Sequence, residues 1–168
     1  SPSGTLGSGL VHLDGGTLNV QADPSTTRTF SKVVDGSGTL QISGGGTVDL
    51  TVSQTFSGST LVSGSTLQLS ASNAVLTAIE LSLGTLAVQV PSGQTYSLSG
   101  PIVGTSGTFT VAGGGTLELY GSAGFLGSTT ITSSTLSLFG LAQIPSSSVS
   151  LSSATLNIQT SPGGTKSF

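Results

Sequence analysis

The chain has 168 residues, which suits one domain with a continuous hydrophobic core. Charged residues make up 5% of it, against about 25% in typical globular proteins. With only three basic residues and a formal net charge of −3, the chain has no positively charged surface that could bind nucleic acid or anionic lipid. The absence of cysteine excludes a disulfide framework, and no apolar run approaches the roughly 20 residues that a membrane helix needs.

A short phrase recurs along the chain: a small residue, Thr, an apolar residue, any residue, and a second apolar residue. Its copies lie at residues 16–20, 38–42, 46–50, 65–69, 84–88, 107–111, 115–119, 134–138 and 154–158. Each copy alternates with a period of two, which predicts a half-buried strand. The residues that we expect to point outward are Asn19, Gln41, Asp49, Gln68, Thr110, Glu118, Ser137 and Asn157.

The spacing of the phrases reveals a longer repeat. From Thr17 onward, their Thr residues are separated by about 22, 8, 19, 19, 23, 8, 19 and 20 positions. Residues 17–84 therefore match residues 85–154 at an interval of about 69, and a third copy begins at residues 155–168. Phe56 and Phe125 are also 69 positions apart, and Phe30, Leu98 and Phe168 each follow the opening Thr of their copy by 13.

Short strands separated by Gly and Ser turns, recurring at coil-length intervals, predict a solenoid in which each coil covers the apolar face of the next. We expect an all-β parallel β-helix of about seven coils, roughly 35 Å long, formed by one domain over residues 1–168. Residues 71–83 come closest to a helical pattern, but 74–76 and 79–83 are better interpreted as two short strands. An antiparallel sandwich or barrel is the alternative fold.

Residues 34–50 and 55–70 carry a run of phrases that point to a family: Gly-Thr-Leu-Gln-Ile, Gly-Gly-Gly-Thr-Val-Asp-Leu, Thr-Phe-Ser-Gly-Ser-Thr-Leu and Gly-Ser-Thr-Leu-Gln-Leu. This segment resembles the passenger-associated transport repeat of bacterial autotransporters, and residues 104–139 resemble it more loosely. The resemblance implies a right-handed parallel β-helix that is exported through an outer-membrane pore and carries no catalytic residues in the repeat. Phe56 and Phe125 stand where the family usually has Tyr.

The best acidic pair is Asp49 and Glu118, which occupy equivalent outward positions one long repeat apart. Stacked three coils apart they would be separated by about 14 Å. That exceeds the spacing of about 5–9.5 Å between the carboxylates of glycoside hydrolases. Both are therefore interpreted as solvated surface acids, and no catalytic residue is assigned.

The other polar candidates are also interpreted structurally. Asp14, Asp23 and Asp35 adjoin Gly or Pro and are expected in turns, and no calcium-binding repeat phrase accompanies them. His12 is the single histidine, is expected to face outward, and cannot hold zinc alone. The glycine triplets at residues 44–46 and 113–115 lack the Lys of a phosphate-binding loop and are expected to form turns. The sequence thus predicts no metal and no cofactor site.

We expect a non-enzymatic structural element of the bacterial cell surface or extracellular space, without nucleic-acid binding or membrane insertion of this segment. No signal peptide is visible, so the chain is expected to be a mature product or an excised fragment. Neither end has the composition of a polar cap, which favours a piece of a longer array or head-to-tail stacking into a fibre. The alternative is an adhesin that binds glycans or proteins on its polar outer face. An enzyme is the least favoured class.

Overall fold

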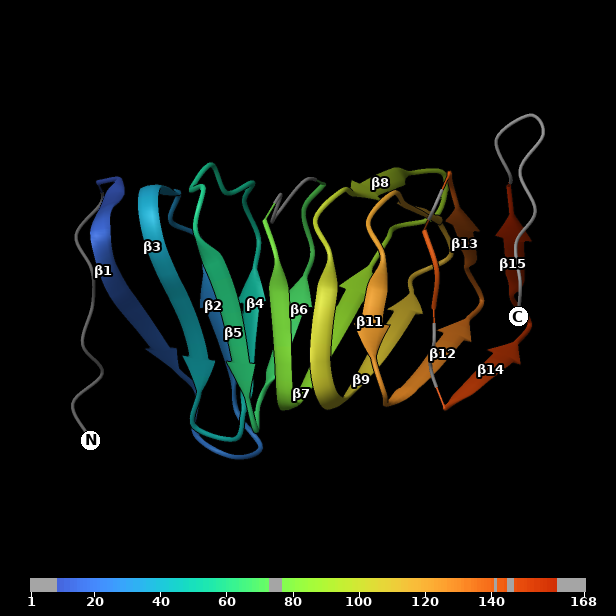
Figure 1. The fold of residues 1–168 in the computed structure, drawn as a ribbon, viewed down its shortest axis with the longest axis horizontal. Helices are drawn as coiled ribbons and strands as arrows, with labels where there is room; N and C mark the ends of the chain where they lie inside the picture. Colours follow the sequence, from blue (N-terminus) through green and yellow to red (C-terminus); the bar gives the residue numbers. More distant parts are fainter. Residues whose placement is uncertain (1–8, 73–76, 141, 145–146, 160–168) are drawn as a thin grey trace.

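The computed structural model describes residues 9–72, 77–140, 142–144 and 147–159, which form strands and turns without a helix. The strands wind into a parallel β-solenoid of about seven turns, which lies as a rod in Figure 1. Strands nearest the viewer run downward while the chain advances from left to right, so the coil is right-handed, as parallel crossover connections generally are. The predicted β-helix is confirmed. The antiparallel alternative is wrong, because every pairing between named strands is parallel.

Fifteen strands make up the described part of the rod. They are β1 (Val11–Gln21), β2 (Thr27–Phe30), β3 (Val34–Ser43), β4 (Thr47–Leu50), β5 (Ser59–Ser63), β6 (Thr66–Leu69), β7 (Ile79–Gln89), β8 (Thr95–Leu98), β9 (Ile102–Ala112), β10 (Thr116–Leu119), β11 (Ala123–Phe125), β12 (Ser128–Thr132), β13 (Thr135–Leu138), β14 (Ser148–Ser152) and β15 (Thr155–Ile158). The expected strand at 79–83 is confirmed as the start of β7, and residues 74–76 lie outside the described chain.

Each turn of the solenoid has three sides, visited in a fixed order. The first side holds the four-stranded sheet of β8, β10, β13 and β15. The opening halves of β1 and β3 pair with each other and occupy the same place in the order of the chain, directly before the second side. The second side holds the closing halves of β1 and β3, then β5, the opening halves of β7 and β9, and β11. The third side holds β2, β4, β6, the closing halves of β7 and β9, β12 and β14. Four long strands therefore bend around a corner.

The core is a single column of apolar side chains inside these three sides. Leu40, Leu67, Leu86 and Leu117 have no exposed surface, and each such burial contributes about 1.5–3 kcal/mol. Phe109, from the third side, meets Phe125, from the second side, edge to face with ring centroids 6.4 Å apart. The expected outward residues alternate as predicted, and Ser137, in register between Glu118 and Asn157, is the one that is buried. Phe168 lies outside the described residues.

The sequence interpretation assumed that the repeated phrases stack in one column. They are instead distributed over all three sides of the solenoid. Thr17 and Thr39 pair on the second side. The Thr residues at 47, 66, 85 and 108 stack on the third side, and those at 116, 135 and 155 stack on the first. The step of eight residues is too short for a full turn, so it carries the chain around one corner to the adjacent side instead.

The 69-residue repeat therefore advances three turns and one further side. Its turns keep their conformation despite this shift. Gly44 has a φ of 101° at the corner between the second and third sides, and Gly113 has a φ of 107° between the third and first. A Cβ on either would lie 2.5 Å from a carbonyl oxygen, of Ala22 and Val90 respectively. Both positions require glycine, which confirms that the triplets form turns.

Candidate functional site

The predicted acidic pair is separated by the geometry of the repeat. Asp49 lies in β4 on the third side, between Thr29 and Gln68 in register. Glu118 lies in β10 on the first side, between Ser97 and Ser137. The two carboxylates thus belong to different sheets rather than to one column three coils apart. This placement corrects the sequence interpretation and moves Asp49 and Glu118 out of any shared site.

Two of the three expected turn aspartates belong to strands instead. Asp14 lies in β1 and Asp35 in β3, because these strands bend at their glycines without ending. Asp23 does stand at a turn, where its carbonyl oxygen accepts hydrogen bonds from the backbone nitrogen of Thr26 at 3.0 Å and from its hydroxyl at 2.6 Å. The turn prediction is therefore confirmed for Asp23 and wrong for the other two.

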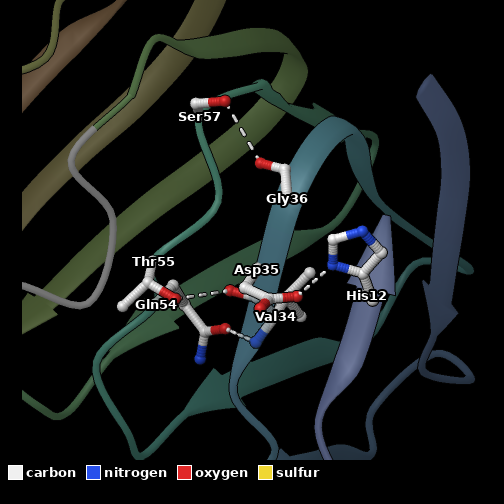
Figure 2. Close-up of polar contacts among 7 residues, drawn as sticks. All are labelled: His12, Val34, Asp35, Gly36, Gln54, Thr55 and Ser57. Carbon is white, nitrogen blue, oxygen red and sulfur yellow. Dashed lines mark hydrogen bonds and ion pairs between the residues drawn. The ribbon is translucent and has the colours of Figure 1, made fainter. Parts of the chain in front are cut away.

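His12 faces outward as expected and has a partner that its sequence neighbourhood does not reveal. Its Nδ1 lies 2.7 Å from Oδ1 of Asp35, the residue beside it in register (Figure 2). The hydroxyl of Ser57 donates to the carbonyl oxygen of Gly36, the residue after Asp35, at 3.1 Å. The imidazole is two-thirds exposed, and a polar contact between side chains so placed contributes little to stability.

Gln54 is a buried polar residue that fills a gap in the strand ladder. Its Oε1 accepts a hydrogen bond from the backbone nitrogen of Val34 at 2.7 Å (Figure 2). Its Nε2 donates to the carbonyl oxygens of Lys32 at 3.1 Å and Val52 at 2.9 Å. Both ends of the Gln54 amide are therefore hydrogen-bonded to backbone groups, which makes the role of Gln54 structural.

The most distinctive feature of the outer surface is a pair of stacked aromatic rings at the edge of the first side. Tyr120 follows β10 and Phe139 follows β13, and their backbone nitrogens bond to Leu98 and Leu119 respectively in equivalent positions. Their ring centroids are 4.9 Å apart with an interplanar angle of 15°. Tyr120 is 49% exposed, whereas the other aromatic residues of the described chain are wholly or partly buried.

Polar groups surround this aromatic pair. The hydroxyl of Tyr120 donates to Oε2 of Glu118 at 3.0 Å, and the hydroxyl of Ser97 donates to the same oxygen at 3.3 Å. The hydrogen bond to Glu118 raises the pKa of the Tyr120 phenol above its ordinary value of 10.0, with desolvation and the carboxylate charge acting in the same direction. The carboxylate is therefore held in place beside the rings.

Sequence reasoning missed the aromatic pair although a signal for it existed. Tyr120 and Phe139 each come directly after a copy of the repeated phrase, so they occupy the same position on successive rungs. In the first long repeat, the corresponding positions hold Thr51 and Ser70. The sequence shows an aromatic residue directly after each of two successive phrases, but only the register of the strands shows that the two rings meet.

Outward residues on adjacent rungs also hydrogen-bond to one another. Ser43 donates to Oδ1 of Asn19 at 2.8 Å, and Asn157 donates to the hydroxyl of Ser137 at 3.5 Å. Among the described residues, no group of three or more His, Cys, Asp or Glu side chains could hold a metal ion. Nor does any helix long and apolar enough to cross a membrane occur in that part of the chain.

Comparison of the chain with protein-family models, with curated proteins and with solved structures finds no match in any of the three.

Proposed function

We propose that this chain is a non-enzymatic structural β-solenoid of the bacterial cell surface, of the autotransporter passenger kind, and that it associates end to end through its C-terminal rung. The fold and the resemblance of residues 34–70 to the transport repeat support the passenger assignment. The separation of Asp49 from Glu118 supports a structural rather than catalytic role.

The observation that carries the proposal is the exposure of apolar side chains on β14 and β15, the last two strands of the described residues. Leu151 is 49% exposed and Val149 43%, although their register partners Ile131 and Thr129 are fully buried. Ile158 in β15 is exposed in the same way. These side chains are in register with core positions of the preceding rung, and within the described residues β14 and β15 each pair with one strand only, β12 and β13. An exposed strand edge of this kind can pair with another strand.

The first rung differs from the last. Val20 and Phe30 in β1 and β2 are already buried. Arg28 stands in register with the core residue Val48, and it is exposed. An inward-pointing charge at a sheet edge discourages pairing with another strand. The occupant that fits the C-terminal edge is therefore the same edge of a second copy, related by a two-fold axis. The difference between the two ends therefore favours a tail-to-tail pair, and the head-to-tail fibre stays the alternative arrangement of the same self-association.

Sedimentation of the purified chain at increasing concentration tests this proposal. We expect a monomer–dimer equilibrium that Leu151→Lys abolishes, because lysine at a core position of the edge cannot be buried unpaired. Ser150→Lys is the matched control. Its register partner Thr130 points away from the core, so a lysine at position 150 should leave the dimer intact. A chain that stays monomeric throughout, or filaments seen by electron microscopy, would contradict the tail-to-tail pair.

Surface location needs its own measurement. Antibodies against the chain should label intact bacteria that produce it, and protease added outside the cells should remove the signal. Labelling that appears only after the cells are permeabilised would contradict the proposed location.

A further inference from the structure

We propose that the edge of the first side around Tyr120 and Phe139 is a binding site for a neutral oligosaccharide. The site comprises the two rings, Glu118 and Ser97, and it is independent of the C-terminal edge that mediates the proposed self-association.

The internal repeat shows that the fold does not need aromatic residues here. Thr51 and Ser70 occupy the corresponding positions of the first long repeat. Their backbone nitrogens bond to Phe30 at 3.3 Å and Leu50 at 3.1 Å, in the same pattern as Tyr120 and Phe139. The turn therefore forms without aromatic side chains, and the two rings are an additional feature of a surface that is otherwise rich in hydroxyl groups.

The arrangement leaves one face of the tyrosine ring accessible. Phe139 covers the face directed toward the C-terminal end of the rod. On the opposite side, the neighbour in register is Ser99, which is itself exposed and too small to cover a phenol ring. Sugars present an apolar face of C–H groups, and a flat aromatic ring of this kind is the surface on which they stack.

The polar neighbours match the hydroxyl groups of a sugar. Oε2 of Glu118 already accepts two hydrogen bonds, from Ser97 and Tyr120, and these bonds fix the carboxylate. Its second oxygen can still accept from a ligand hydroxyl. Beyond it, Thr95, Thr116 and Thr135 stand in register along the same side and offer further hydroxyls. A few placed polar groups beside an apolar surface are the usual composition of a ligand site.

The charge of the site selects against acidic glycans. Glu118 supplies a negative charge, and the chain as a whole carries −3. The two basic residues in the described part of the chain, Arg28 and Lys32, belong to the first turn, at the opposite end of the rod. A uronic acid or sulfated sugar would meet uncompensated repulsion, so the ligand class is a neutral glycan.

Titration of the whole chain with defined oligosaccharides tests the site. The probes are hexamers of β-1,4-glucose, α-1,4-glucose, β-1,4-mannose, β-1,4-xylose and β-1,4-N-acetylglucosamine, with oligogalacturonate as the acidic comparison. Binding is followed by calorimetry and by backbone amide shifts. We expect at least one neutral probe to bind and to shift the amides of Ser97, Glu118 and Tyr120, while oligogalacturonate does not bind there.

The decisive variant carries Tyr120→Thr and Phe139→Ser, which installs the residues that the first long repeat uses at the same positions. It should fold normally and bind at least about tenfold more weakly. Thr51→Ser, at the equivalent corner of the first long repeat, is the matched control and should leave binding unchanged. The proposal is wrong if no neutral probe binds, if oligogalacturonate binds best, or if the folded double variant binds as tightly as the original chain.

Discussion

Ser65 and Ser134 make the same hydrogen bond at two different corners of the solenoid. The hydroxyl of Ser65 accepts from the backbone nitrogen of Gly45 at 2.9 Å, and that of Ser134 accepts from Gly114 at 3.0 Å. The two serines are 69 residues apart, yet one follows the second side and the other the third. The repeat thus preserves its turn contacts while it moves them around the rod.

This equivalence predicts equal losses of stability. Ser65→Ala and Ser134→Ala each remove the side-chain partner of a glycine nitrogen, and each should lower the free energy of unfolding by about 0.5–1.5 kcal/mol, because the exposed glycines can bond to water instead. The double variant should show the sum, because the two sites share no contacts. Urea denaturation measures both, with Ser63→Ala as an outward control. Unequal losses from the two single variants would show that the corners are not equivalent.

Replacement of Gln54 should be more damaging than replacement of an exposed glutamine. Gln54→Leu leaves the nitrogen of Val34 and the carbonyl oxygens of Lys32 and Val52 without their side-chain partner, at a cost of about 1–3 kcal/mol for each group that stays buried. Thermal melting measures the loss, and hydrogen exchange should show a faster-exchanging amide at Val34. Gln21→Leu is the control on the exposed surface. A melting temperature unchanged by Gln54→Leu would refute the role of Gln54 as a backbone clamp.

Asp49 is a position where substitution should stabilise the chain. Its Oδ1 is buried and has no hydrogen-bond partner among the described residues. Thr occupies the same outward column at positions 29, 110 and 130. Asp49→Thr should therefore raise the free energy of unfolding by about 1 kcal/mol. Glu118→Thr is the contrasting variant, since it removes two hydrogen bonds and should not stabilise. A lower melting temperature for Asp49→Thr would contradict the expectation.

The contact between Tyr120 and Glu118 predicts a pH dependence. Because the folded state raises the pKa of the phenol, the contribution of this hydrogen bond to stability is complete below pH 10 and is lost as the pH rises through the raised pKa. In a Tyr96→Phe background, absorbance at alkaline pH reports Tyr120 alone. Adding Glu118→Gln should move the titration to lower pH. An unchanged midpoint would show that the carboxylate does not act on the phenol.

The strands could be predicted well from the sequence, because the alternation of apolar and polar residues shows directly which side chains of a strand point inward. Leu40 and Ile42 point inward as the period of two requires, and the glycines at 44 and 113 mark the corners. The sequence did not predict on which side of the solenoid each strand lies, since the repeated phrase has the same pattern on all three sides. Contacts between rungs, such as His12 with Asp35, depend on register between residues 23 positions apart. The aromatic pair was missed for the same reason.

The shift of one side per long repeat has a consequence for any longer array built from the same unit. A feature carried once in each unit would point in three successive directions and return to its first direction only after three units. A glycan-binding edge so distributed would face the whole circumference of the rod. A flat partner lying alongside would meet it at every third unit, whereas a surrounding network of chains could engage all of them.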